Sequence, residues 1–153
     1  GYLISSVVSC DLLAVAVYCP THGSRFVDTN RDPVFPTERG NRPGAGSIVA
    51  AVEAGAQRTP ISIGKPAPLL LEMAVRAAGG GLTRDDAVMI GDGVATDLAA
   101  ANGLGIPCVL MLTGVTTRAQ ADALPADGRP FATAADATEL AEILASLAVG
   151  RHA

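Results

Sequence analysis

Short apolar runs alternate with amphipathic stretches over the second half of the chain. Each run is too short for a helix and suits a strand that is buried on both faces. The runs lie at residues 61–63, 87–90 and 106–112. The stretches between and after them repeat apolar residues at helical spacing, which predicts helices with one core-facing stripe each. The clearest stripes consist of Leu70, Met73, Ala74 and Ala77, and of Leu140, Ile143, Leu144 and Leu147.

This order of elements predicts the α/β class. Strands that alternate with helices form right-handed βαβ units, so we expect a three-layer, Rossmann-like parallel sheet with helices on both faces. A polar helix at residues 117–123, a last strand from Phe131 and a terminal helix complete the pattern. Asp136 and Glu139, three residues apart, predict a capping box at the start of that terminal helix.

The first part of the chain follows a less regular pattern. The expected elements are a strand at residues 2–8, a helix at 11–18, a strand at 25–28 and a helix at 43–55. Asp11 is the expected cap of the first helix, and Pro20 is expected to stop it. Residues 29–43 combine Asn, Asp, Pro and Gly, which predicts an irregular surface loop. A break at Arg58-Thr59-Pro60 predicts two domains, at residues 1–58 and 59–153.

The composition narrows the class of partners. Of the 153 residues, 49% are apolar and only 17% are charged, and the net charge is −4. A nucleic-acid-binding surface normally has an excess or a cluster of basic residues, and neither is present here. The apolar N-terminal run is interrupted by serines and an aspartate too early to span a membrane. We therefore expect neither nucleic acid nor a membrane as a partner.

The cysteine and histidine residues show no metal-ligand spacing. The three cysteines, Cys10, Cys19 and Cys108, form no C-x-x-C pair. We expect each to be a small buried apolar residue, which fits a reducing compartment and a cytoplasmic location. His22 and His152 are expected at the surface.

The candidate chemistry lies where the apolar run at 87–90 ends. Asp92 stands between Gly91 and Gly93, and Asp97 follows five residues later. Thr96 or Asp97 is expected to cap the next helix. Two carboxylates on one short turn offer the hard oxygen ligands that Mg²⁺ prefers. The alternative is an ordinary strand-to-helix turn with a capping acid.

A lysine is expected at the same edge of the sheet. Lys65 follows the strand at 61–63, as Asp92 follows the strand at 87–90. The carboxyl ends of parallel strands meet at one rim, where ligands of open α/β sheets bind. A metal ion beside an ammonium group suits a phosphate, because both share its negative charge.

Five segments carry a resemblance to a known family. They are TNRD at 29–32, PGAG at 43–46, IGKP at 63–66, IGDGVATD at 90–97 and LTGV at 112–115. In this order and spacing they resemble the haloacid dehalogenase (HAD) superfamily of phosphatases, in its NagD-like and p-nitrophenyl phosphatase-type subgroup. The resemblance implies the C-terminal half of a HAD core, preceded by the tail of an inserted α/β cap domain.

The resemblance also implies an activity and residue roles. Such enzymes hydrolyse small phosphate monoesters through an aspartyl-phosphate, with sugar phosphates, glycerol phosphate, phosphoglycolate and p-nitrophenyl phosphate as substrate types. Lys65 would steady the phosphoryl group and the nucleophile, and Asp92 would bind Mg²⁺. Asp97 would support the metal site or orient Lys65. Asn30 and Asp32 would contribute to substrate binding from the cap.

The chain departs from the family at the nucleophile. It contains no Asp-x-Asp-Gly signature, and its Asp-Gly pairs are Asp92-Gly93 and Asp127-Gly128. Its first residue, Gly1, is not Met, so we expect that the chain begins within a longer protein. We expect the chain alone to be inactive, and to form a homodimer or associate with the missing N-terminal half. The alternatives are a degenerate, non-catalytic binding or assembly module and, more remotely, a receiver- or flavodoxin-like domain.

Overall fold

The computed structural model describes residues 8–150, which fold as two compact units. The first unit ends at Gly64 and the second begins at Lys65. The strand expected at residues 2–8 falls on residues outside this range apart from Val8, and His152 also lies outside it. Within the described residues, no helix is both long enough and apolar enough to cross a membrane. The structure divides the chain after Gly64. That residues 1–58 and 59–153 belong to two different domains stays a prediction.

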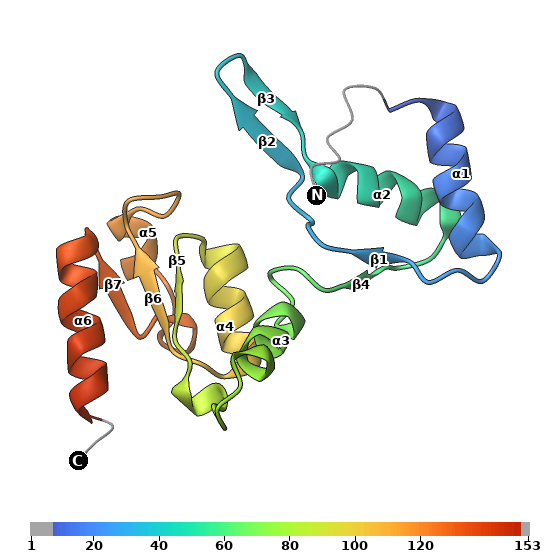
Figure 1. Ribbon diagram of the computed structural model, residues 1–153. Coiled ribbons are helices and arrows are strands. Elements are labelled where there is room, and N and C mark those ends of the chain that lie inside the picture. Colours follow the sequence, from blue (N-terminus) through green and yellow to red (C-terminus); the bar gives the residue numbers. More distant parts are fainter. Residues whose placement is uncertain (1–7, 151–153) are drawn as a thin grey trace. The chain divides into compact units, whose positions relative to one another are not determined.

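The first unit combines two helices with two small sheets (Figure 1). Its elements are α1 (Cys10–Thr21), β1 (Val27–Asp28), β2 (Val34–Thr37), β3 (Gly40–Pro43), α2 (Ala45–Ala56) and β4 (Ile61–Ser62). Strand β1 pairs in parallel with β4, and β2 pairs with β3 in an antiparallel hairpin. Helix α1 packs along α2.

Helix α1 begins and ends differently from its prediction. Ser9, not Asp11, is the N-cap, because the Ser9 hydroxyl accepts a hydrogen bond from the Leu12 N–H at 3.3 Å. The helix continues through Pro20 to Thr21. Proline removes only one backbone donor and its fixed φ is helical, so the last turn tolerates it.

The loop expected at residues 29–43 is wrong for its second part, which forms the β2–β3 hairpin. The Thr37 hydroxyl donates a hydrogen bond to the Gly40 carbonyl across the turn at 2.7 Å, and Gly40 adopts a φ of +106°. Glycine favours that left-handed backbone. Both faces of the hairpin are largely exposed, so most of its residues are polar and the sequence gives no strand pattern.

Two glycines fasten the hairpin to the start of α2. The Gly44 N–H donates to the Pro33 carbonyl and the Gly46 N–H to the Asp32 carbonyl, each at 2.9 Å. A Cβ atom on Gly44 would collide with the backbone of Asp32, and a Cβ atom on Gly46 would collide with the backbone of Arg31. The glycine pair therefore serves a close backbone approach.

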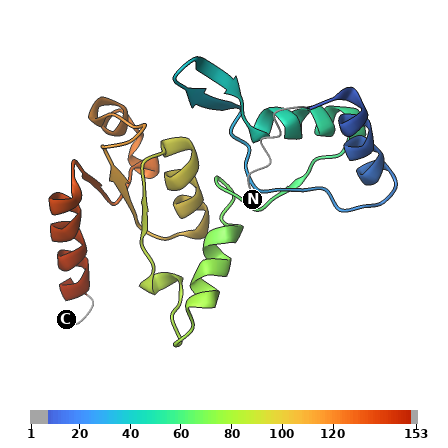
Figure 2. The same ribbon diagram turned by 45° about the horizontal axis from the view of Figure 1, so that its top comes forward.

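The second unit has the predicted parallel α/β architecture. Its main elements are α3 (Leu69–Ala78), β5 (Met89–Gly91), the turn η2 (Val94–Leu98), α4 (Ala99–Leu104), β6 (Cys108–Met111), α5 (Arg118–Asp122), β7 (Ala132–Ala134) and α6 (Ala137–Gly150). Two short 3₁₀ turns, η1 (Arg84–Asp86) and η3 (Ala126–Gly128), connect them. The three strands are parallel in the order β5-β6-β7. Helix α6 lies on the β7 side of this sheet, and α3 and α4 lie on the β5 side (Figures 1 and 2).

The core of the second unit centres on β6. Val109 and Leu110 are fully buried. Leu98, Ala101, Ile106 and Cys108 form a buried cluster, against which partly buried residues such as Leu71 and Met89 pack. The predicted stripe of α6 is half-buried at all four positions. The predicted cap of α6 is confirmed: the Asp136 carboxylate accepts the Thr138 and Glu139 N–H groups, and Glu139 accepts the Ala135 N–H.

The expected core stripe of α3 is wrong. Leu70 and Met73 are 50% and 53% exposed, and α3 contacts the core through Leu71. Helical spacing identifies an apolar face but not what covers it, and no apolar element of the described residues lies on this one. Cys10 and Cys19 are also exposed, against expectation, because they lie on the short, open helix α1, whereas Cys108 is buried as expected.

Substitution of Gly46 tests the close approach at the base of the hairpin. Gly46→Ala should lower the free energy of unfolding of the first unit by about 1–3 kcal/mol, because the new Cβ has to displace the Arg31 backbone. Urea titration followed by circular dichroism measures the change. Gly103→Ala is the control, since its Cβ would meet nothing closer than 3.5 Å. Equal unfolding midpoints for the two variants would contradict this account.

Candidate active site

Strand β5 ends in a turn that directs a carboxylate back at its own backbone. After Gly91 the chain enters a π-helical turn, in which the N–H groups of Asp97 and Leu98 both donate to the Gly93 carbonyl, at 2.9 and 3.0 Å. Asp97 Oδ2 accepts the N–H groups of Asp92 and Gly93, each at 3.0 Å. Asp97 therefore closes the strand-to-helix turn. The expected cap of α4 by Thr96 or Asp97 is wrong, because Leu98 occupies the N-cap position.

Glycines make room for these carboxylates. A Cβ on Gly91 would collide with the Asp97 carboxylate, and a Cβ on Gly114 would collide with the Asp92 carboxylate. Both side chains thus lie directly against backbone that carries no side chain.

Lys65 joins the cluster through Asp97. The Lys65 Nζ donates to Asp97 Oδ1 at 2.5 Å. Asp97 is only 3% exposed, whereas 44% of the Lys65 side chain is exposed. The ammonium group is therefore fixed on one side by a buried acid and open to solvent on the other. Lys65 is also the only lysine in the sequence.

The electrostatics favour an ionised pair. Burial tends to raise the pKa of Asp97, but the hydrogen bond and charge of Lys65 and the two backbone N–H groups outweigh it, so the pKa lies below its ordinary value of 3.8. Burial and the nearby Asp97 charge raise the pKa of Cys108 to about 11. The Asp97 carboxylate is thus charged at neutral pH, and the thiol beneath it stays protonated.

Asp92 is held by the loop that follows β6. Its Oδ2 accepts the Val115 N–H at 3.0 Å, and its carbonyl accepts the Thr116 hydroxyl at 2.5 Å. Its Oδ1 accepts no hydrogen bond from the described residues, and the side chain is half-buried. One carboxylate oxygen therefore stays open for a cation. The sequence analysis missed Val115 and Thr116, although the LTGV segment marked this loop.

The donor set fits Mg²⁺ as a partial site. Among the described residues, no three His, Cys, Asp or Glu side chains are arranged around a common metal position. Mg²⁺ usually takes one or two carboxylates, with water and substrate phosphate completing its shell. Asp92 meets that requirement, whereas both Asp97 oxygens already accept hydrogen bonds.

Asn30 and Asp32, the predicted substrate-binding residues, lie on the turn after β1 in the first unit. Asn30 Oδ1 accepts the Asp32 N–H at 2.6 Å, which is a local turn contact. Their role in substrate binding stays a prediction. Asp28, at the start of the segment expected to contribute to substrate choice, is buried and accepts the Ser62 hydroxyl at 2.7 Å.

Comparisons with known proteins identify the family of the chain. A family model described as HAD-hydrolase-like matches residues 62–140, which is more than half of the chain. The chain is 36% identical over 115 residues to the 5′-nucleotidase YutF of Bacillus subtilis, an alignment of 75% of this chain and 44% of that protein. It is 41% identical over 108 residues to the D-glycerol 3-phosphate phosphatase of Mycobacterium tuberculosis, covering 69% of this chain and 29% of that protein.

Solved structures show the same similarity. The p-nitrophenyl phosphatase from Archaeoglobus fulgidus superposes with a TM-score of 0.80 at 30% identity, covering 90% of this chain and 53% of that one. The glycerol phosphate phosphatase of M. tuberculosis in complex with magnesium gives 0.78 at 36% identity, covering 90% and 40%. The chain spans less than half the length of the curated relatives it matches. By fold, motif and sequence, the chain belongs to the HAD-like hydrolases, in the NagD-like and p-nitrophenyl phosphatase-type subgroup.

Proposed function

We propose that this chain carries the magnesium- and phosphate-binding half of a phosphatase that hydrolyses small phosphate monoesters. The main support is the Lys65–Asp97 pair, which holds an ammonium group at the end of the β5 turn with its outer side open. Asp92 belongs to the same turn, since its N–H bonds to Asp97, and it keeps one carboxylate oxygen open. A cation and an ammonium group together match the charge of a phosphate.

Each residue has a distinct task in this proposal. Lys65 binds oxygens of the phosphoryl group, and Asp97 orients Lys65 through their hydrogen bond. Asp92 binds Mg²⁺ through its open carboxylate oxygen, while the Val115 N–H holds the other oxygen. The bound Mg²⁺ would share the negative charge that phosphoryl transfer spreads over the phosphate oxygens.

The substrate class follows from the relatives. Their names include p-nitrophenyl phosphatase, glycerol phosphate phosphatase and acid sugar phosphatase. We propose a small phosphorylated metabolite of this kind for the whole protein. The attacking carboxylate has to come from outside the 153 residues, because they contain no Asp-x-Asp signature.

The edge of β5 is the proposed place for the nucleophile strand. Among the described strands, β5 pairs only with β6. Ile90, on β5, is 42% exposed. An unpaired strand edge beside an exposed apolar residue favours hydrogen bonding to a further strand. We propose that a strand of the other half of the HAD core pairs here, with a second copy of this chain as the alternative occupant.

The absent signature also favours a second candidate function. A degenerate relative would use Lys65 and Asp92 to bind phosphorylated ligands without turnover. It would share every binding property of the phosphatase half, so only the supply of a nucleophile separates the two.

Metal binding tests the role of Asp92. Titration with Mn²⁺ should broaden the amide NMR signals of Gly93 and Val115 in the wild-type chain, and Asp92→Asn should weaken binding by about tenfold or more because it removes the ligand charge. Asp127→Asn, which alters the exposed second Asp-Gly pair, should leave binding unchanged. Broadening that is identical in Asp92→Asn and wild type would remove Asp92 from the metal site.

The pKa of Asp97 tests its pairing with Lys65. Without the ammonium group, burial dominates, so Lys65→Met should raise the pKa of Asp97 above its wild-type value. The lowered wild-type pKa stabilises the fold above the unfolded pKa near 3.8, and this stabilisation is lost as the pH falls through the folded pKa. Carboxyl ¹³C NMR titration measures the shift. Arg76→Met, which breaks an exposed pair with Glu72, should not change it.

Turnover separates the two candidate functions. The chain alone should not hydrolyse p-nitrophenyl phosphate with Mg²⁺. Addition of the part of the B. subtilis relative that this chain does not match should restore hydrolysis that Asp92→Asn abolishes. If the two halves associate and metal binds, but no hydrolysis appears, the degenerate binding module is the correct function.

A further inference from the structure

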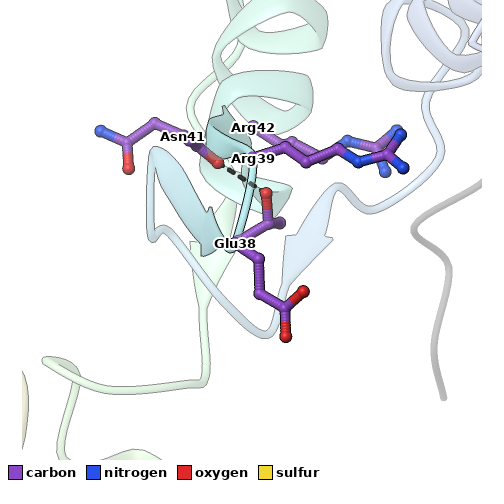
Figure 3. A pocket seen from close by; sticks show the side chains of 6 residues that line it. Glu38, Arg39, Asn41 and Arg42 are labelled. Atoms are coloured by element: carbon purple, nitrogen blue, oxygen red, sulfur yellow. Dashed lines mark hydrogen bonds between the residues drawn. The ribbon is translucent and has the colours of Figure 1, made fainter.

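Helix α1 of the first unit has an apolar outer face. Leu12, Val15 and Tyr18 are 57%, 63% and 60% exposed, and Cys19 is exposed as well. The turn of the β2–β3 hairpin, by contrast, presents polar side chains, which Figure 3 shows directed away from the backbone. The outer face of a surface helix is normally polar, so an apolar one indicates a surface that binds another molecule.

The exposed apolar residues of α1 follow the spacing of a helix–helix seam. Leu12, Val15 and Cys19 are separated by three and four residues, and Val8, just before the helix, continues the pattern. These three helical residues form the α1 stripe. Positions spaced alternately by three and four lie along one side of a helix and form the contact line of paired helices. Another side of α1 is already occupied, because Val17 lies against α2.

Asp11 and Tyr18 flank the α1 stripe. Asp11 is the only charged residue of α1, and its carboxylate forms no ion pair or hydrogen bond with another described residue. The Tyr18 hydroxyl has no such partner either, while its ring stacks on His22 with centroids 3.7 Å apart. Within one helix, Asp11 and Tyr18 are seven residues apart, which is about 10 Å and too far for direct contact.

A second copy of α1 in antiparallel orientation would satisfy both groups. A two-fold axis at the level of Ala14 brings Leu12 of one copy against Val15 of the other, and Asp11 of one against Tyr18 of the other. Each contact then occurs twice, as in any two-fold interface. A hydrogen bond from a hydroxyl to a carboxylate is charge-assisted and strong. A parallel pair would instead place the two Asp11 carboxylates together, and like charges repel.

We propose that α1 is a homodimer interface, in which the α1 stripe packs antiparallel on the same stripe of a second copy. Because each helix has only 12 residues, the contact lies at the lower end of the size range of specific interfaces, and we expect a reversible dimer. The interface lies in the first unit and uses neither β5 nor the cluster of Lys65, Asp92 and Asp97. It therefore goes beyond the proposed phosphatase function and is independent of it.

The oligomeric state of the full chain tests the proposal. Sedimentation velocity over a series of protein concentrations, with a reductant to keep the cysteines free, should show a monomer–dimer equilibrium. Val15→Glu should weaken the dimer by about a hundredfold or more, because each dimer would bury two charges in its seam. Ala14→Glu is the matched control. It places the same charge at an exposed position of the same helix, beside the stripe, and should dimerise like wild type.

A double-mutant cycle tests the antiparallel orientation. Asp11→Asn and Tyr18→Phe should each weaken the dimer about tenfold, because each removes a charge-assisted hydrogen bond that occurs twice. The double variant should be no weaker than the single variants, since both remove the same bond. The two residues cannot touch within one helix, so this coupling requires two copies. Stronger association of Asp11→Asn would indicate a parallel pair and overturn the proposal.

Two further results separate the α1 interface from other ways of covering an apolar surface. Ile90→Lys alters the edge of β5 and should leave the dimer unchanged, whereas loss of the dimer in this variant alone would overturn the proposal. A chain that stays monomeric at every concentration would also overturn it. A lower free energy of unfolding of monomeric Val15→Glu would then show that the α1 stripe is covered within one chain.

Discussion

The buried carboxylate of Asp97 is the constraint on which the second unit depends. A carboxylate that is 3% exposed has to be matched by donors, because burying it unpaired costs several kcal/mol, a large fraction of the stability of a domain. Lys65 and the N–H groups of Asp92 and Gly93 supply three donors. This one side chain therefore fixes the end of β5, the π-helical turn and the direction of the Lys65 ammonium group. Gly91 has to remain a glycine for the same reason.

The hydrogen bonds of Asp97 make its environment different from that of Asp92. Both oxygens of Asp97 accept hydrogen bonds, from Lys65 and from the N–H groups of Asp92 and Gly93. Asp92 is restrained on one oxygen by the Val115 N–H and on its carbonyl by Thr116. Its other oxygen is the open one. Two carboxylates five residues apart thus have different environments, and only the environments, not the residue types, assign them to different tasks.

The sequence predicts the strands and helices that carry a local residue pattern, but not how deeply they are buried: Ile90, on a strand expected to be buried on both faces, is 42% exposed. Strands β5 and β6 and the capped helix α6 follow from apolar runs and from Asp136, since burial and capping both leave a local signature. The sequence analysis brings Lys65 and Asp92 together through one shared sheet edge, and that reason is wrong, because β4 pairs with β1 and not with β5. Lys65 nevertheless reaches Asp97 through a direct hydrogen bond. The backbone donor Val115 could not be identified, because a main-chain N–H is the same for every residue type. The hairpin was missed because its exposed faces give no alternation of apolar and polar positions.

The wrong prediction for α3 and the exposed edge of β5 have the same physical origin. An apolar helix face or an apolar strand indicates a surface that is buried in the folded protein. The prediction assumed that another part of this chain buries it. Leu70, Met73 and Ile90 remain exposed on elements whose other sides pack normally. The relatives are more than twice as long as the matched segment, so a further half of the HAD core exists in this family. Exposed apolar residues, together with a cluster of Lys65, Asp92 and Asp97 that lacks an attacking group, are what a core divided between two segments would present. The exposed apolar residues and the missing nucleophile therefore have one explanation, and it requires no change in the chemistry assigned to the residues that are present.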